Sequence, residues 1–442
     1  MPSGDRRVLW VLPILLLALL APFISTGARA QETVLALEFS FSNPGARSMG
    51  FGGAFVALAD DATAAFANPA GLVQLARPEV SIEGRYWSYS TPYTEGGRLF
   101  GEPTGIGVDT TAGLRIEESN QDLTGLSFLS FVYPWKKFSF AIYRHQLANF
   151  EFFSETQGFI RGIPELGPLA AERFPDQRSG VDFELVTHAV SAAYRLTEDF
   201  SLGLGISHIE SDLFSRTDEY QPPTVYFPNP YLEEKLDTVA SLSIEGSDWT
   251  WSAGFLWSIA EQWRLGGFYR SGPEFQLEAW SISGPGHPWG PGADLGSVGS
   301  SITAPAVWGI GFAFRSTSGR LTLAFEWDRV EYATLVDSLD PAAFPAPPVL
   351  EDGDEYHVGG EYAFLGSKPV VALRLGAWLD PDHQLRAPAG SGPLLQALRP
   401  PGEDQMHYSG GIGLAFERFQ IDFGIDLSEF VDTASISAIY SF

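Results

Sequence analysis

The chain has 442 residues, a formal net charge of −27 and no cysteine. The absence of cysteine excludes disulfide bonds and thiolate metal sites, and the acidic balance argues against a nucleic-acid partner, because phosphate binding needs clustered Lys and Arg. Only 18% of the residues are charged, which is low for a soluble acidic protein. The length allows either two or three soluble domains or one large barrel.

The N-terminus has the parts of a secretory signal peptide, which we predict over residues 1–30. A basic pair precedes an apolar core over residues 8–24, and a small-residue cleavage site ends at Ala30. A single membrane anchor is the alternative, although this core is short for a span and contains proline. No later segment provides the ~18 apolar residues of a transmembrane helix. An exported chain of this kind is either soluble or a β-barrel.

The next stretch, residues 31–77, is rich in small residues and lacks the alternation that follows it. Small side chains let one backbone pass close to another, and glycine admits φ > 0 without steric cost. We predict a compact hatch, or plug, inside the structure that follows; an ordinary glycine-rich loop is the alternative. The residues expected to shape and gate the hatch are Asn43, Pro44, Gly45, Gly50, Gly52, Gly53, Asp60, Asp61, Asn68, Pro69 and Gly71.

Residues 78–442 alternate in polarity, as the wall of a transmembrane β-barrel does. Successive side chains of a strand point to opposite faces, and we predict an all-β fold with about 14 antiparallel strands. In a membrane barrel the apolar face meets lipid and the polar face lines the lumen, whereas a soluble sandwich would bury the apolar face. The connections alternate between short and long, which is typical of outer-membrane barrels with periplasmic turns and extracellular loops.

The last predicted strand ends in an aromatic residue, Phe442. Exported barrels commonly close with such a strand, which resembles the signal read by the barrel assembly machinery. We therefore expect that machinery to be a partner through Phe442.

At this point the residues resemble the FadL/TodX-type family of outer-membrane transport proteins. The stretch GARSMGFGGAFVALADDATAAFANPAGL (residues 45–72) is similar to the family's N-terminal hatch, and the likeness continues in residues 263–275, 302–332 and 357–381. The resemblance implies an integral protein of a Gram-negative-type outer membrane, in contact with its lipid and lipopolysaccharide. It also implies a 14-stranded barrel that takes up hydrophobic molecules, such as long-chain fatty acids or hydrocarbons, through an apolar pocket gated by the hatch.

The family resemblance further implies lateral release of ligand, through a gap beside a kinked third strand. The third predicted strand here, residues 137–150, contains no Gly or Pro to mark such a kink. Some similar proteins serve assembly or secretion instead, so the alternative is a scaffold barrel that binds a protein partner. A polar porin is disfavoured, because an open pore does not need a hatch.

Arginines fall at predicted inward positions, where a charge avoids the cost of facing lipid. In the structural interpretation, opposite charges cross-link a filled barrel. In the functional one, an arginine holds a ligand carboxylate by bidentate donation. The candidate ligand-binding residues are Arg270, Arg374 and Phe268; a neutral hydrocarbon would need no arginine.

No enzymatic role is expected, because neither a nucleophile elbow nor a zinc-protease motif is present. The histidines are scattered without metal-ligand spacing, so we expect no metal site and no cofactor. The acidic segment 350–355 lacks the alternating ligands of a Ca²⁺ loop and is interpreted as a solvated loop.

Overall fold

The computed structural model describes residues 42–106, 109–163, 167, 170–220, 235–340 and 348–442. The predicted signal peptide and residues 31–41 of the predicted hatch therefore lie outside the described residues. None of the helices in these ranges is both long and apolar enough to cross a bilayer.

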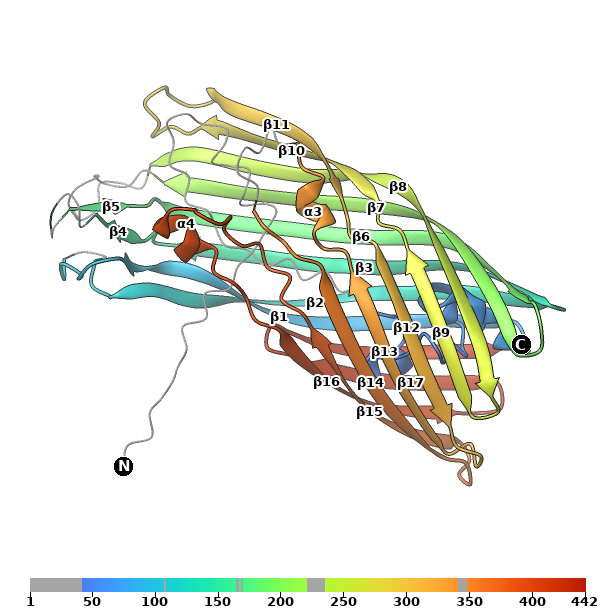
Figure 1. Ribbon diagram of the computed structural model, residues 1–442. Coiled ribbons are helices and arrows are strands. Elements are labelled where there is room, and N and C mark those ends of the chain that lie inside the picture. The colour runs from blue at the N-terminus through green and yellow to red at the C-terminus, as the bar shows by residue number, and fades with distance from the viewer. Residues whose placement is uncertain (1–41, 107–108, 164–166, 168–169, 221–234, 341–347) are drawn as a thin grey trace, which may run out of the picture.

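The described chain forms one closed antiparallel sheet (Figure 1). Its wall strands are β1 (Glu79–Leu99), β2 (Gly113–Trp135), β3 (Phe138–Thr156), β6 (Asp176–Arg195), β7 (Phe200–Tyr220), β8 (Leu236–Ala260), β9 (Trp263–Arg270), β10 (Glu274–Ser283), β11 (Asp294–Thr303), β12 (Val307–Arg315), β13 (Leu321–Val330), β14 (Gly353–Phe364), β15 (Val370–Asp380), β16 (Gln405–Ala415), β17 (Phe419–Leu427) and β18 (Val431–Ser441). Pairing of β1 with β18 closes the barrel. A short hairpin of β4 (Ile160–Gly162) and β5 (Ala171–Arg173) lies outside this succession.

The wall has fourteen strands, because two pairs of segments are each one strand interrupted once. Segments β9 and β10 both pair with β8, and they pair in turn with β12 and β11. The interruptions contain Pro273 and Pro305, and proline cannot donate a ladder hydrogen bond. The predicted fourteen-stranded all-β barrel is confirmed.

The apolar faces of the strands look outward. On β7, Leu204 is 64% exposed and Ile206 54%, whereas Ser201 and Ser207 are buried. The same division holds on β13, where Leu323 and Phe325 are exposed while Thr322 is buried. Two stacked sheets would bury these apolar faces against each other, so the sandwich alternative is excluded.

The hatch lies inside the barrel, at the end near the C-terminus (Figure 1). It consists of α1 (Ala46–Gly50), α2 (Ala64–Ala67), the 3₁₀ helix η2 (Pro69–Gln74) and tight turns. Inward wall serines hold it: Ser201 donates to the carbonyl of Ala70, and Ser191 donates to the carbonyl of Ala65.

Glycines in the wall let the hatch backbone touch the strands. A Cβ atom on Gly203 would lie 2.2 Å from the backbone nitrogen of Ala70, and one on Gly376 would lie 2.2 Å from that of Gly52. No side chain fits in either place, so hatch and wall meet backbone to backbone. Two further short helices, α3 (Thr334–Asp337) and α4 (Pro393–Leu398), belong to the long connections.

The wall carries a seam between β2 and β3. These strands pair only over Phe128–Trp135 and Phe138–His145. Beyond that point β2 continues to pair with β1, and β3 continues to pair with β6. The register of β3 against β6 shifts between Gln146 and Ala148, which identifies a β-bulge at Leu147. The bulge bends β3 away from β2 without Gly or Pro.

Candidate functional site

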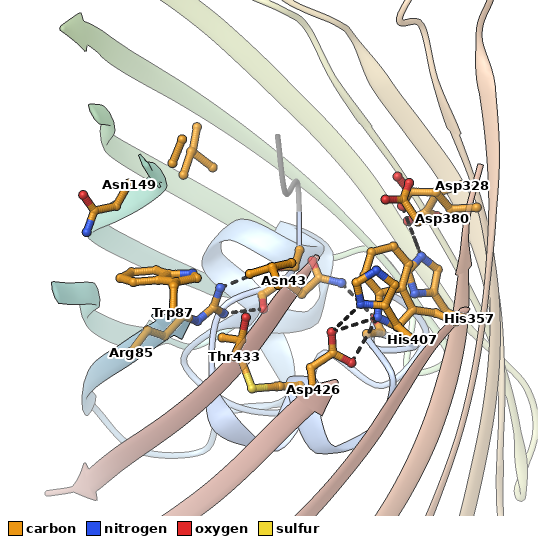
Figure 2. A pocket seen from close by; sticks show the side chains of 18 of the residues that line it. Asn43, Arg85, Trp87, Asn149, Asp328, His357, Asp380, His407, Asp426 and Thr433 are labelled. Atoms are coloured by element: carbon orange, nitrogen blue, oxygen red, sulfur yellow. Dashed lines mark hydrogen bonds and ion pairs between the residues drawn. The ribbon is translucent and has the colours of Figure 1, made fainter. Parts of the chain in front are cut away.

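A cavity lies in the lumen above the hatch (Figure 2). Trp87 and Tyr89 of β1 line one side, and Trp378 of β15 lines the other. Asn43 and Met49 of the hatch line it too. Leu147, the bulged residue of β3, is a further lining residue, so the cavity adjoins the place where β3 leaves β2.

The β13–β17 side of the cavity is acidic. Asp328, Glu355, Asp380 and Asp426 all line it. Aromatic rings stack between these carboxylates: the Trp378 ring lies 3.8 Å from His407 and 5.2 Å from His357, centroid to centroid.

The basic residue on the opposite side, Arg85, is already engaged. Its Nε donates to Glu83 at 2.9 Å, and its Nη2 donates to the backbone carbonyl of Asn43 at 3.0 Å. Glu83 in turn accepts a hydrogen bond from the Gly45 backbone N–H at 2.9 Å. Arg85 and Glu83 therefore fix the first turn of the hatch, and the cavity keeps an acidic lining.

An ion-pair cluster fixes the middle of the hatch. Arg47 contacts Asp60 at 2.6 Å and Asp61 at 3.4 Å, and Arg315 of β12 contacts Asp60 at 2.7 Å. Burial by itself raises the pKa of Asp60, but Arg47 and Arg315 outweigh burial and hold that pKa well below its ordinary value. Arg47 also reaches Glu361 of β14 at 3.5 Å. The cluster ties the hatch to two wall strands.

The predicted hatch residues come together in the lumen. Asn68 donates to the carbonyls of Val56 and Phe255, joining two hatch turns to β8. Gly45, Gly52 and Gly53 have positive φ angles of 97°, 66° and 79°. The others are buried or half-buried within the hatch: Pro44, Gly50, Asp60, Asp61, Pro69 and Gly71.

The candidate ligand residues occupy two different environments. Arg374 is 4% exposed and lies 2.7 Å from both Glu361 and Asp422. Both carboxylates neutralise its guanidinium, which is the arrangement that the structural interpretation expects. Arg374 does not line the cavity.

Arg270 is held by rings rather than by carboxylates. Its guanidinium lies 4.0 Å from the centroid of Phe66 in the hatch and 4.2 Å from that of Phe268. One nitrogen donates weakly to the Asn43 side chain at 3.3 Å, and the buried Nε has no hydrogen-bond partner among the described residues. Asn43 therefore contacts both Arg270 and the cavity.

Sequence patterns identified Asn43 and Gly53 of the cavity lining, but not its aromatic residues. Trp87, Tyr89 and Leu147 were not singled out, because their meeting depends on the bend of β3. Nor was His357, which meets the hatch at the backbone carbonyl of Gly52. The alternation along each strand predicts that these side chains face the lumen, but it does not predict which residues they contact there.

The acidic segment 350–355 is partly paired with arginines. Arg329 contacts Asp352 at 3.3 Å and Asp354 at 3.0 Å. Arg386 contacts Glu351 at 3.0 Å. The interpretation of a solvated loop is wrong for half of this segment, because residues 353–355 begin β14, and both Leu350 and the cavity-lining Glu355 are buried.

Comparison with known proteins gives a consistent result. A profile of the family described as outer membrane protein transport protein (OMPP1/FadL/TodX) matches residues 175–436. No curated protein matches in a sequence search.

Solved structures are similar over nearly the whole chain. A Pseudomonas aeruginosa FadL homologue is 15% identical, with a TM-score of 0.64 over 92% of this chain and 100% of that one. The Ralstonia pickettii toluene transporter TbuX is 13% identical, with a TM-score of 0.55 over 92% and 100%. The Pseudomonas putida toluene transporter TodX is 15% identical, with a TM-score of 0.50 over 91% and 98%. At these identities the likeness is one of fold.

Proposed function

We propose that this chain, which belongs to the outer membrane protein transport family OMPP1/FadL/TodX, takes up uncharged hydrophobic molecules through the cavity above its hatch. The chain is an integral barrel of the outer membrane, so its exposed apolar faces meet lipid. A hydrophobic solute gains little from a water-filled pore. Inside an apolar cavity, each buried CH₂ group contributes about 0.8 kcal/mol.

The lining of the cavity is the observation that carries this proposal. Trp87, Tyr89, Leu147 and Trp378 offer apolar and aromatic surface. The charged groups beside them are mainly carboxylates, and Arg85 is neutralised by Glu83. A solute carboxylate in this cavity would be repelled, whereas a hydrocarbon would not be. The apolar surface also favours transport over the scaffold alternative, which needs no cavity.

The seam between β2 and β3 supports a sideways exit. Leu147, Ala148 and Asn149 line the cavity and also lie at the bulge where β3 parts from β2. Side chains satisfy some of the free backbone groups there: Arg144 donates to the carbonyl of Leu126, and Tyr89 donates to that of Asn149. A solute leaving through the seam would pass from the cavity to lipid without crossing the hatch.

A fatty acid is the second candidate substrate, because Arg270 has an unused donor. Its guanidinium lies against two rings and contacts Asn43, which lines the cavity. If Asn43 moves, a carboxylate can reach this arginine and accept two hydrogen bonds. Arg374 is a weaker choice, since two carboxylates already occupy it.

Binding to the purified, refolded barrel tests these assignments. We expect an alkylbenzene and a fatty-acid methyl ester to bind. The Trp87→Ala variant should bind both at least about tenfold more weakly, as expected for losing roughly 1.4 kcal/mol or more of aromatic contact. Trp257→Ala, on the lipid-facing side, is the matched control and should bind normally. Failure of all neutral ligands to bind would contradict the proposal.

The Arg270→Ala variant separates the two substrate classes. For neutral ligands it should bind as the parent does. If the parent binds only the free acid, and Arg270→Ala loses that binding, the fatty-acid candidate replaces the neutral one. Binding of neither class would favour the scaffold alternative.

A further inference from the structure

We propose that Asp328, Glu355 and His357 form a binding site for a divalent transition-metal ion at the boundary between the wall and the hatch. One ligand atom from each residue lies within 4.8 Å of the others. Asp328 projects inward from β13, directly opposite Glu355 of β14, and His357 follows on the same face of β14. All three line the cavity above the hatch, and Asp328 and His357 are labelled in Figure 2.

The orientation of His357 places its Nε2 where a metal ion would bind. Its Nδ1 lies 2.8 Å from the backbone carbonyl oxygen of Gly52 in the hatch. A carbonyl only accepts, so Nδ1 carries a proton and donates it. The other nitrogen, Nε2, points toward carboxylates, which also only accept, so Nε2 holds either a second proton or a metal ion. It faces Glu355 at 3.2 Å and Asp328 at 3.9 Å. A metal-bound histidine commonly has its second nitrogen held by a carbonyl in this way.

The two carboxylates have little counter-charge beside them, since a protonated His357 supplies only one positive charge. Like charges directly opposite each other on neighbouring strands are destabilising, and a buried charge needs a partner. Asp328 is only 6% exposed, and its Oδ1 has no hydrogen-bond partner among the described residues. The neighbouring Glu326 adds a third carboxylate, although two hatch amides solvate it. Arg270 forms no ion pair within the described chain. A divalent cation would neutralise the pair.

The donor set indicates the class of ion. One imidazole nitrogen and two carboxylates suit a first-row divalent ion such as Zn²⁺ or Mn²⁺ better than Ca²⁺, which prefers oxygen ligands alone. Water from the cavity can complete the coordination. Sequence spacing did not predict this site, because Asp328 joins the other two only through the pairing of β13 with β14.

A bound ion would strengthen the contact between wall and hatch. Metal coordination polarises the imidazole and makes its Nδ1–H a better donor to Gly52. Gly52 belongs to the turn after α1, where the hatch backbone touches β15. Loading the site should therefore slow opening of this turn.

Metal binding to the refolded, chelator-treated barrel tests the proposal, with Zn²⁺ as the probe. Titration calorimetry should give one site per chain. X-ray absorption of the loaded parent should give one imidazole nitrogen together with oxygen donors, a measurement that needs no variant. Amide hydrogen exchange around Gly52 should slow on loading. Absence of stoichiometric Zn²⁺ binding would overturn the proposal, because it would mean that a proton on Nε2 bridges the carboxylates instead.

Three variants and one control locate the ion. Glu355→Gln, Asp328→Asn and His357→Ala should each weaken Zn²⁺ binding by more than about tenfold. His208→Ala is the control, since His208 lies 3.4 Å from Glu210 in a more exposed pair and tests for an adventitious surface site. If His208→Ala abolishes binding, or if the three ligand variants keep parental affinity, the assignment is wrong.

Discussion

The carboxylate of Glu326 in β13 lies 2.7 Å from the backbone nitrogen of Phe55 in the hatch. The same oxygen accepts a second hydrogen bond from the Val56 N–H, also at 2.7 Å. Glu326 is 1% exposed, so both bonds are shielded from water. Hydrogen bonds to an ionised acceptor are about twice as strong as neutral ones. This single wall residue therefore fixes the turn at the centre of the hatch.

Replacing Glu326 with Ala should loosen that turn. The change leaves two buried N–H groups without an acceptor, at a cost of about 1–3 kcal/mol each. We expect amide hydrogen exchange at Phe55 and Val56 to accelerate while the wall strands remain protected. Glu326→Gln keeps an acceptor oxygen and should show a smaller effect. Thr322→Ala, on the same inward face, should leave the hatch unchanged; equal acceleration there would remove the special role of Glu326.

Locking the hatch to the wall should stop uptake without preventing assembly. A Cβ atom on Gly311 of β12 would lie 3.5 Å from the Cβ of Ala57 in the hatch, which is within the range for a disulfide. The chain contains no other cysteine, so an Ala57→Cys/Gly311→Cys variant forms one defined cross-link. We expect uptake of the neutral ligand to fall when the variant is oxidised and to recover on reduction.

The control for that experiment joins two wall strands instead. Ala363 of β14 and Ala372 of β15 are directly paired, and cysteines at both positions leave the hatch free. Oxidation of the control should not affect uptake. Unaltered uptake in the oxidised hatch variant would mean that the hatch need not move.

Local patterns were enough to predict the wall and the plug. Leu202, Leu204 and Ile206 alternate with small or polar residues, and that period of two fixes which face is apolar. The connections alternate in length because turns and loops lie at opposite ends of the barrel. The small residues between Asn43 and Leu72 marked a segment that packs by its backbone.

Contacts between distant strands were not predictable from such patterns. Gly203 and Gly376 read as ordinary members of a polar face, yet each makes room for the hatch. The bend of β3 comes from one extra residue, Leu147, and no residue type in this strand predicts a bulge at that position. Arg270 and Arg374 are equivalent in the sequence pattern, because both fall at inward positions of a strand. In the folded lumen, Arg374 contacts two carboxylates, whereas Arg270 contacts two aromatic rings.

Deleting Leu147 should close the seam. His145 faces inward opposite Thr187, and Ala148 faces inward opposite Leu185, so removing one residue between them restores regular alternation. A straight β3 could then continue its pairing with β2. We expect the barrel to assemble but to release ligand into the bilayer more slowly, measured as transfer of a fluorescent hydrophobic probe to vesicle lipid. Leu147→Ala keeps the bulge and is the control; if the deletion transfers probe as fast as this control does, the seam is not the exit.

Acid should release the hatch through Asp60. Arg47 and Arg315 hold the pKa of Asp60 below its ordinary value against the opposing effect of burial. A lowered pKa stabilises the folded hatch fully above the unfolded-state value of about 3.9, and this stabilisation is lost as pH falls through the lowered value. Burial raises the pKa of the neighbouring Asp61, so protonation of Asp61 does not destabilise the hatch and cannot produce the loss.

Single-channel conductance in planar bilayers measures this release. We expect the parent to open progressively more often as pH falls below about 4, because Asp60 of the released hatch takes up a proton at a higher pH than Asp60 of the closed hatch does. Asp60→Asn should open at neutral pH, because it loses charged hydrogen bonds that contribute about 1.5–3 kcal/mol each. Asp199→Asn, at an exposed turn, should behave as the parent does. A closed Asp60→Asn channel at neutral pH would show that Arg47 and Arg315 hold the hatch without this carboxylate, since the amide keeps the shape of the side chain and removes only its charge.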